Sequence, residues 1–257
     1  MKKNQSNHGL AMTLLKGRTF IVLIVLLIFF SFAAPNFFSQ NTMLLIAKHV
    51  ALYGILAIGM TYVIITGGID LSVGAVVGLA GMVAGGLINK GLTLPMFGVT
   101  LYFDVPLIVL ITIVVGALVG WLNGIVITRF NVAPFIATLG MMYVARGLAM
   151  LHSNGATYSN IVGKPALGNT GYDFFGSSVL GIPVGAIILV FIAVITAVLL
   201  KFTPFGWHVF AIGGNEKAAR LSGIKVNRVK IMVYILSGIC AAIVGIINSA
   251  QLVAAHP

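Results

Sequence analysis

The chain has 257 residues, of which 60% are hydrophobic and 7% are charged, and its formal net charge is +11. A soluble globular domain carries about 25% charged residues, so this composition excludes a water-soluble fold and indicates a protein whose solvent is a lipid bilayer. A basic excess can also indicate nucleic-acid binding. Because the cytoplasmic loops of membrane proteins collect Lys and Arg, we expect a membrane protein with no nucleic-acid partner.

About seven apolar segments approach the length of roughly 20 residues that a membrane-spanning helix needs. In chain order they cover 19–34, 43–66, 71–89, 105–128, 132–151, 180–200 and 231–252. Gly, Pro and Asn residues, which favour turns, separate them. We expect an all-α polytopic transmembrane helix bundle that forms a single integral-membrane domain over 1–257. The chain stops just after the last segment, and we expect it to be a fragment of a longer protein.

Glycines recur at helical spacing in two of these segments. Small residues on one face let membrane helices approach closely, so each stripe predicts tight contact with a neighbouring helix. The stripes consist of Gly74, Gly78, Gly81 and Gly85 in the third segment and Gly116, Gly120 and Gly124 in the fourth.

The basic residues orient the chain. Lys and Arg precede the first segment, and they cluster again between 201 and 230. If the spans alternate, these two regions lie on the same side, which the positive-inside rule makes the cytoplasm. We therefore expect a cytoplasmic N-terminus, a cytoplasmic loop at 201–230 and an external loop at 152–179.

A possible break between helices lies at "TGGIDLS", residues 66–72. Gly67 and Gly68 can end one helix, and Asp70 or Ser72 can cap the next. The residues alone favour a capped reversal. The alternative is a break whose carboxylate lines a polar path, because such breaks are tolerated only inside protein or beside water.

Other polar side chains also lie within the apolar segments. Together with Asp70, the candidates for a translocation path are Asn123, Thr138 and Arg146. Amides and hydroxyls in bundles more often join helices, and Arg146 can instead extend to the membrane surface. The chain has neither a metal-ligand spacing of His and Cys nor a phosphate-binding G-x-x-x-x-G-K-[ST] motif. We therefore expect no metal, no cofactor and no catalytic residues.

A short helix is predicted at 216–222, within the basic loop. Asn215 is a favourable N-cap, Glu216 suits the positive helix start, and Arg220 suits its end. Gly223 can end the helix, while Ala218, Ala219 and Leu221 offer a small apolar docking surface. The alternative is a solvated basic loop bound to anionic lipid.

Three stretches together resemble a known family. They are "GGIDLSVGAVVGLAG" (67–81), "NVAPFIATLGMMYVARGLAM" (131–150) and "AIGGNEKAARLSGIKV" (211–226). The chain resembles ribose-type ATP-binding-cassette (ABC) importer permeases of the branched-chain amino acid/ribose permease superfamily. Family members continue beyond the point where this chain stops and often carry Arg at the position of Trp207.

The resemblance implies a transmembrane transport subunit that is not an enzyme. Such a subunit moves a monosaccharide across the bacterial inner membrane by alternating access. Its partners would be a cytoplasmic ABC ATPase, a periplasmic sugar-binding protein, a second permease copy and membrane lipid. The residues that would couple it to the ATPase are Gly213, Gly214, Asn215, Glu216, Ala218, Ala219, Arg220, Ser222 and Gly223.

Three other functions remain open at this point. The chain could be an amino-acid ABC permease, an ATP-independent secondary transporter or an inactive truncated permease. Ion-coupled transporters usually employ intramembrane carboxylates, and only Asp70 could serve here. The residues do not name the sugar.

Overall fold

The computed structural model describes residues 3–257, with side chains from Gly17 onward. The chain divides into two compact units, Met1–Ile46 and Ala47–Pro257. The first unit holds α1 (Lys3–Ala33) and the first residues of α2 (Gln40–Ile65). From Phe20 to Phe30 the apolar side chains of α1 are exposed, which is the arrangement expected of a lipid-facing helix.

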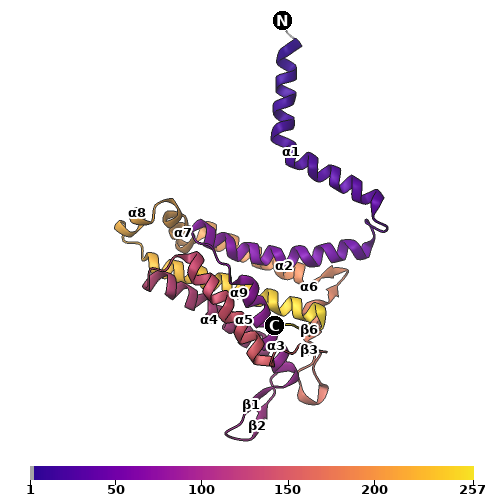
Figure 1. Ribbon diagram of the computed structural model, residues 1–257, viewed down its shortest axis with the longest axis vertical. Helices are drawn as coiled ribbons and strands as arrows, with labels where there is room; N and C mark the ends of the chain where they lie inside the picture. The colour runs from indigo at the N-terminus through magenta and orange to yellow at the C-terminus, as the bar shows by residue number, and fades with distance from the viewer. Residues whose placement is uncertain (1–2) are drawn as a thin grey trace. The chain divides into compact units, whose positions relative to one another are not determined.

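The second unit is a helix bundle (Figure 1). It contains the rest of α2 together with α3 (Val73–Asn89), α4 (Val105–Arg129), α5 (Pro134–Ser153), α6 (Val184–Phe202) and α9 (Val226–Leu252). Among the described residues, five helices are long and apolar enough to cross a membrane, and Gly17–Ala33 and Val73–Asn89 are shorter apolar helices. Each of the segments predicted to span the membrane is therefore helical, and the predicted all-α transmembrane fold is confirmed.

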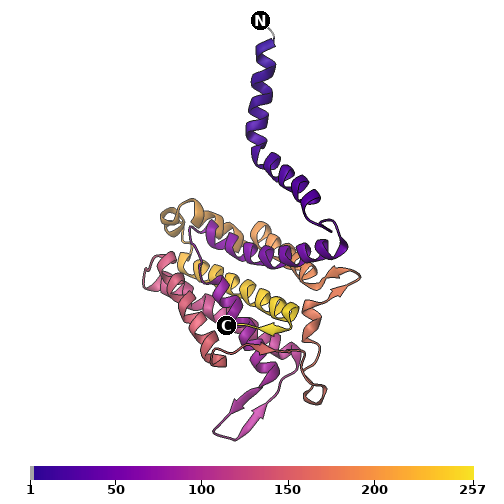
Figure 2. The same ribbon diagram turned by 45° about the vertical axis from the view of Figure 1, so that its right-hand side comes forward.

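Helix α9 lies at the centre of the second unit. It packs most extensively against α4 and then against α3, and both views show α4 and α9 side by side (Figures 1 and 2). A Cβ on Gly116 would collide with the backbone carbonyl of Gly238, and a Cβ on Gly238 would collide with that of Gly116. The glycine stripe of α4 therefore permits the close contact that the sequence predicted.

The glycine stripe of α3 differs from the prediction in its first half. Gly81 faces Gly245 and Ser249 of α9. A Cβ on Gly74, in contrast, would meet no described atom within 4 Å. The prediction of one continuous packed face is therefore wrong: Gly81 packs against α9 and Gly85 packs against Tyr158 and Ile161, whereas Gly74 faces open space.

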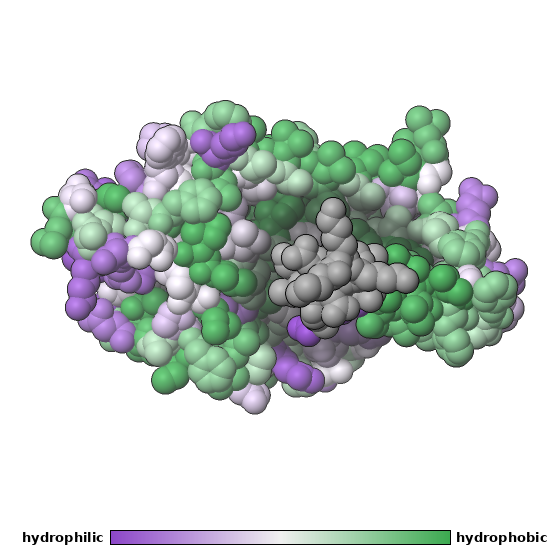
Figure 3. Space-filling model, turned by 90° about the horizontal axis from the view of Figure 1, so that it is seen from above, coloured by the Kyte–Doolittle hydropathy of each residue, from purple (hydrophilic) through white to green (hydrophobic). Residues whose placement is uncertain are grey.

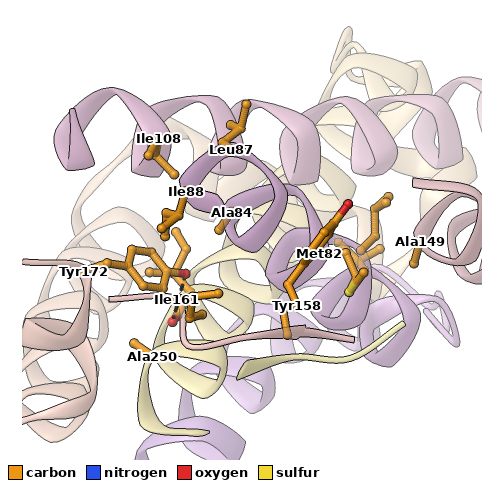
Figure 4. Close-up of a cluster of buried hydrophobic side chains, with 14 of the residues drawn as sticks. Met82, Ala84, Leu87, Ile88, Ile108, Ala149, Tyr158, Ile161, Tyr172 and Ala250 are labelled. Carbon is orange, nitrogen blue, oxygen red and sulfur yellow. Dashed lines mark hydrogen bonds between the residues drawn. The ribbon is translucent and has the colours of Figure 1, made fainter. Parts of the chain in front are cut away.

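The loop at 152–179 packs into the bundle. It forms β3 (Tyr158–Ser159), η1 (Pro165–Leu167), η2 (Tyr172–Gly176) and β4 (Ser178–Val179). Tyr158, Ile161 and Tyr172 join a buried cluster with Met82 and Ile88 of α3 (Figure 4). This segment is therefore an ordered cover over one end of α3 and α9.

The strands are short and pair antiparallel. β1 (Leu92–Leu94) pairs with β2 (Val99–Leu101), so that Leu92 lies opposite Leu101. β3 pairs with β6 (Ala254–Ala255), and β4 pairs with β5 (Ile182–Pro183). The pairing of β3 with β6 holds the cover against the residues that follow α9.

Two short helices, α7 and α8, lie between α6 and α9, and the sequence predicted only α8. α8 (Glu216–Leu221) matches the short helix expected there. α7 (Pro204–Gly214) was missed: the expected loop at 201–230 contains this second helix, and Gly213 and Gly214 lie in its last turn. The missed signal is Thr203–Pro204: the Thr203 hydroxyl accepts a hydrogen bond from the Gly206 N–H at 3.4 Å, and proline favours the first helical position.

Candidate functional site

The break between α2 and α3 is real and brings a carboxylate into the bundle interior. Gly67 has φ +75°, the left-handed conformation in which glycine ends helices. The N–H of Gly68 then donates to the carbonyl of Val63 at 2.9 Å. Asp70 follows within the break and is only 2% exposed.

Asp70 organises the start of α3. Its Oδ1 accepts hydrogen bonds from the Ser72 backbone N–H at 3.0 Å and from the Ser72 hydroxyl at 2.6 Å. Ser72 is the N-cap residue, but its side chain makes no capping bond to the helix. The polar acceptor at this helix start is therefore the Asp70 carboxylate.

Three other helices attach to the same break. The Ser237 hydroxyl of α9 donates to Asp70 Oδ2 at 2.9 Å, and Asn123 Nδ2 of α4 donates to Ser72 Oγ at 2.9 Å. The Thr138 hydroxyl of α5 donates to the Ile69 carbonyl at 3.2 Å and accepts from the Leu71 N–H at 3.1 Å. A buried carboxylate is costly unless donors surround it, and hydrogen bonds to a charged acceptor are stronger than neutral ones.

The hydroxyl of Tyr234 also lies against the break, at Gly68. We call this group the break cluster; its members are Asp70, Ser72, Asn123, Thr138, Tyr234 and Ser237. Three of the residues assigned to a path from sequence therefore come together here. Sequence reasoning missed Ser237 and Tyr234, and their spacing on one face of an apolar helix was the available signal.

Arg146 lies apart from the break cluster. Its side chain is exposed, and it has no ion pair with a side chain in the described part of the chain. It borders a hollow of about 210 Å³ between α3 and α5, whose other lining residues are Gly74, Ala75, Gly78, Met142, Ala149 and Pro257. The open first half of the α3 glycine stripe forms one wall of this hollow.

The α7–α8 segment, residues 204–225, has the caps that its sequence predicts. Asn215 Oδ1 accepts from the Ala218 N–H at 3.0 Å, and Gly223 ends α8 with φ +83°. Exposed basic side chains surround α8 at Lys217, Arg220, Lys225 and Arg228. Figure 3 shows hydrophilic side chains gathered at the left of its view, the side on which Figure 1 draws α8.

An ion pair joins α8 to α9. Glu216 Oε2 lies 2.6 Å from Lys230 Nζ, and Glu216 Oε1 lies 3.1 Å from Arg220 Nη2. The hydrogen bond from Lys230 is the main reason why the pKa of Glu216 falls below its ordinary value. Glu216, Arg220 and Lys230 also line a hollow of about 220 Å³ beside the turn between α4 and α5. α8 therefore lies close to α9 and to this turn.

The predicted docking surface of α8 requires a correction at Ala219. Ala219 is 5% exposed and packs in a buried cluster with Val226 and Val229, because it lies on the side of α8 that faces α9. Ala218 is exposed, and Leu221 is 90% exposed. The apolar surface available to a partner therefore consists of Ala218 and Leu221.

Residues 42–257 match the family described as branched-chain amino acid transport system / permease component. The chain belongs to this family. It is 44% identical over 93% of its length to the ribose import permease protein RbsC of Bacillus subtilis, of which it covers 69%. It is 36% identical over its whole length to the ribose import permease protein RbsC of Haemophilus influenzae, of which it covers 76%.

The permease also resembles a protein whose name gives another sugar. It is 35% identical over 90% of its length to the galactofuranose transporter permease protein YtfT of Escherichia coli, of which it covers 65%. No solved structure matches the chain. The family predicted from the three sequence stretches is confirmed, and the permease is a multi-pass membrane transport subunit and not an enzyme.

Proposed function

We propose that this chain is the transmembrane subunit of an ABC importer that moves a ribose-like monosaccharide across the bacterial inner membrane by alternating access. The observation that carries this proposal is the 44% identity to a ribose import permease over 93% of the chain. The family description also names branched-chain amino acids, so an amino-acid permease is the second candidate.

The break cluster favours an ATP-driven permease over an ion-coupled transporter. Coupling ions usually bind intramembrane carboxylates. Both oxygens of Asp70 are engaged by the side chains of Ser72 and Ser237. The other members of the cluster are hydroxyl and amide groups, which offer a coupling ion no second carboxylate.

The proposed orientation decides which side of the permease each partner would contact. With the N-terminus in the cytoplasm, α8 lies on the cytoplasmic side, where its exposed Ala218 and Leu221 would enter a groove of the ATPase. The cover at 152–179 would then face a periplasmic sugar-binding protein. A second permease copy would complete the importer, and lipid would surround it.

We place the substrate path at the hollow beside Arg146 and not within the break cluster. Arg146 offers hydrogen-bond donors to a hollow of about 210 Å³ whose α3 wall is made by Gly74 and Gly78. Asp70, Asn123 and Thr138 form hydrogen bonds that join α9, α4 and α5 to the break. They would hold together the helices that border the path.

Uptake measurements test the function. Cells that lack their own ribose importer would receive this permease, its neighbouring ATPase and its binding protein, and uptake of labelled ribose and leucine would be compared. Ribose uptake that requires the ATPase is the expected result. Ribose uptake that persists without the ATPase would contradict the proposal, and uptake of leucine alone would establish the amino-acid candidate.

A substitution in the hollow tests the path. Gly78→Leu would fill the space beside Arg146 and should lower sugar uptake by about tenfold, the effect of roughly 1.4 kcal/mol on the limiting step. Gly140→Leu is the matched control, because a Cβ on Gly140 meets no described atom within 4 Å and the residue is exposed elsewhere on α5. Equal sugar uptake by the two variants would contradict the proposal that the substrate path runs through this hollow.

A further inference from the structure

One buried hydroxyl in the break cluster is left without a partner. Tyr234 is 1% exposed, and its Oη has no hydrogen-bond partner among residues 17–257. Buried tyrosine hydroxyls nearly always find a partner, so this group calls for an explanation. It lies against the break itself, because a Cβ on Gly68 would be 2.5 Å from Tyr234 Oη.

Ser237, which donates a hydrogen bond to Asp70, lies one turn beyond Tyr234 on α9. Ser237 donates to Asp70 Oδ2 at 2.9 Å, and Tyr234 precedes Ser237 by three residues on α9. Residues at this spacing share a helix face and differ by about 4.5 Å along the axis. Two hydroxyl groups of α9 therefore lie on the face that meets the break, and Asp70 accepts a hydrogen bond from Ser237 alone of these two.

The same face of α9 continues to α8. Lys230 lies four residues before Tyr234 and forms the 2.6 Å ion pair with Glu216 of α8. Lys230, Tyr234 and Ser237 thus form one stripe that begins at α8 and ends at the break. If α8 moves, its ion pair with Lys230 would pull on α9 and so shift Tyr234 and Ser237 relative to Asp70.

We propose that Asp70 is a positioning residue for transport that exchanges its α9 partner between two states. In the state described here it accepts from Ser237, and in the second state it accepts from Tyr234 after α9 has moved by less than one turn. The released Ser237 hydroxyl can then bond a carbonyl of its own helix. This inference rests on the proposed function, because the two states are those of alternating access.

The exchange predicts opposite effects for two conservative substitutions in the purified permease. Tyr234→Phe removes a hydroxyl that is unpaired in this state, so the melting temperature in detergent should stay equal or rise. Ser237→Ala removes the bond that this state uses, so its melting temperature should fall. Tyr143→Phe, at an exposed tyrosine of α5, is the control and should match the wild type.

The reconstituted importer provides the second measurement. ATP hydrolysis stimulated by the sugar-loaded binding protein should fall about tenfold in Tyr234→Phe, as expected for the loss of one hydrogen bond in the second state, although the variant is at least as stable as the wild type. A lower melting temperature in Tyr234→Phe would overturn the exchange, and so would stimulated hydrolysis equal to that of the wild type. A wild type that the sugar does not stimulate would count against the proposed function, while the melting temperatures would still decide the exchange.

Discussion

At the scale of single residues, Asp70 shows how a charge can be kept inside a membrane protein. Its carboxylate accepts two bonds from Ser72 and one from Ser237, so donors on two elements replace the water that it loses. The charge is thus tied to the geometry of the break. Removing the carboxylate should therefore affect the bundle more than removing an exposed acid.

We expect Asp70→Ala to lower the free energy of unfolding by about 2 kcal/mol, because the substitution leaves buried donors of Ser72 and Ser237 without their acceptor. Thermal melting in detergent measures the change. Asp104→Ala is the matched control, because Asp104 also precedes a helix but is exposed and makes no capping bond. Similar losses in the two variants would show that the Asp70 bonds contribute little.

The ion pair of Glu216 should make stability depend on pH. Because Lys230 lowers the pKa of Glu216 below 4.5, its stabilisation is present above the ordinary carboxyl pKa and is lost as the pH falls through the lowered value. Wild type should therefore have a higher melting temperature than Glu216→Gln at neutral pH. The matching difference in the free energy of unfolding should be less than about 1 kcal/mol, because the pair is partly exposed. The difference in melting temperature should close only as the pH falls below the ordinary carboxyl pKa of Glu, about 4.3. A gap that is constant across this range would exclude the ion pair as its cause.

At the scale of elements, α8 separates a packed face from an exposed one. Ala219 faces α9, whereas Ala218 and Leu221 face outward. A six-residue helix is marginal alone, and its packing on α9 and its caps stabilise it. This arrangement leaves the outward face available for a partner.

Substitutions on the two faces of α8 should differ in their effects. Leu221→Asp should abolish sugar-stimulated ATP hydrolysis with an unchanged melting temperature, because the exposed side chain contributes to docking and not to the fold. Ala219→Glu should lower both, because a carboxylate would enter a buried cluster. The melting temperature is measured on the purified permease, and the stimulated ATP hydrolysis is measured on the reconstituted importer. Normal stimulation in Leu221→Asp would refute docking through this face.

At the scale of the whole molecule, the distribution of Lys and Arg predicts which ends of the bundle face the cytoplasm. Cys240 is the only cysteine in the chain, and it is buried. The chain therefore offers a nearly cysteine-free background in which single exposed positions can be labelled.

In a Cys240→Ala background, Ala166→Cys in η1 should react with a membrane-impermeant maleimide in intact cells. Leu221→Cys in α8 should react only after the membrane is opened, because an odd number of spans separates the two positions. Both positions are exposed, so access alone decides the result. Labelling of residue 221 in intact cells would reverse the proposed orientation.

The sequence by itself determined the solvent, the spans and the ends of α8. Each of these depends on local features: about 20 apolar residues cross a bilayer, and caps such as Asn215 and Gly223 act within a turn or two of their own position. The same local chemistry at Thr203–Pro204 was present and predicts α7 once it is considered. The family also follows from local stretches, and the comparison bears it out.

Only the tertiary structure decided which polar residues meet. Asp70 lies 167 residues from Ser237 along the chain, and no periodicity relates the two. It also decided that Ala219 is buried and that the first half of the α3 glycine stripe borders a hollow beside Arg146. The physical reason is that helix packing brings together faces from distant segments, whereas a sequence pattern reports only the face on its own helix.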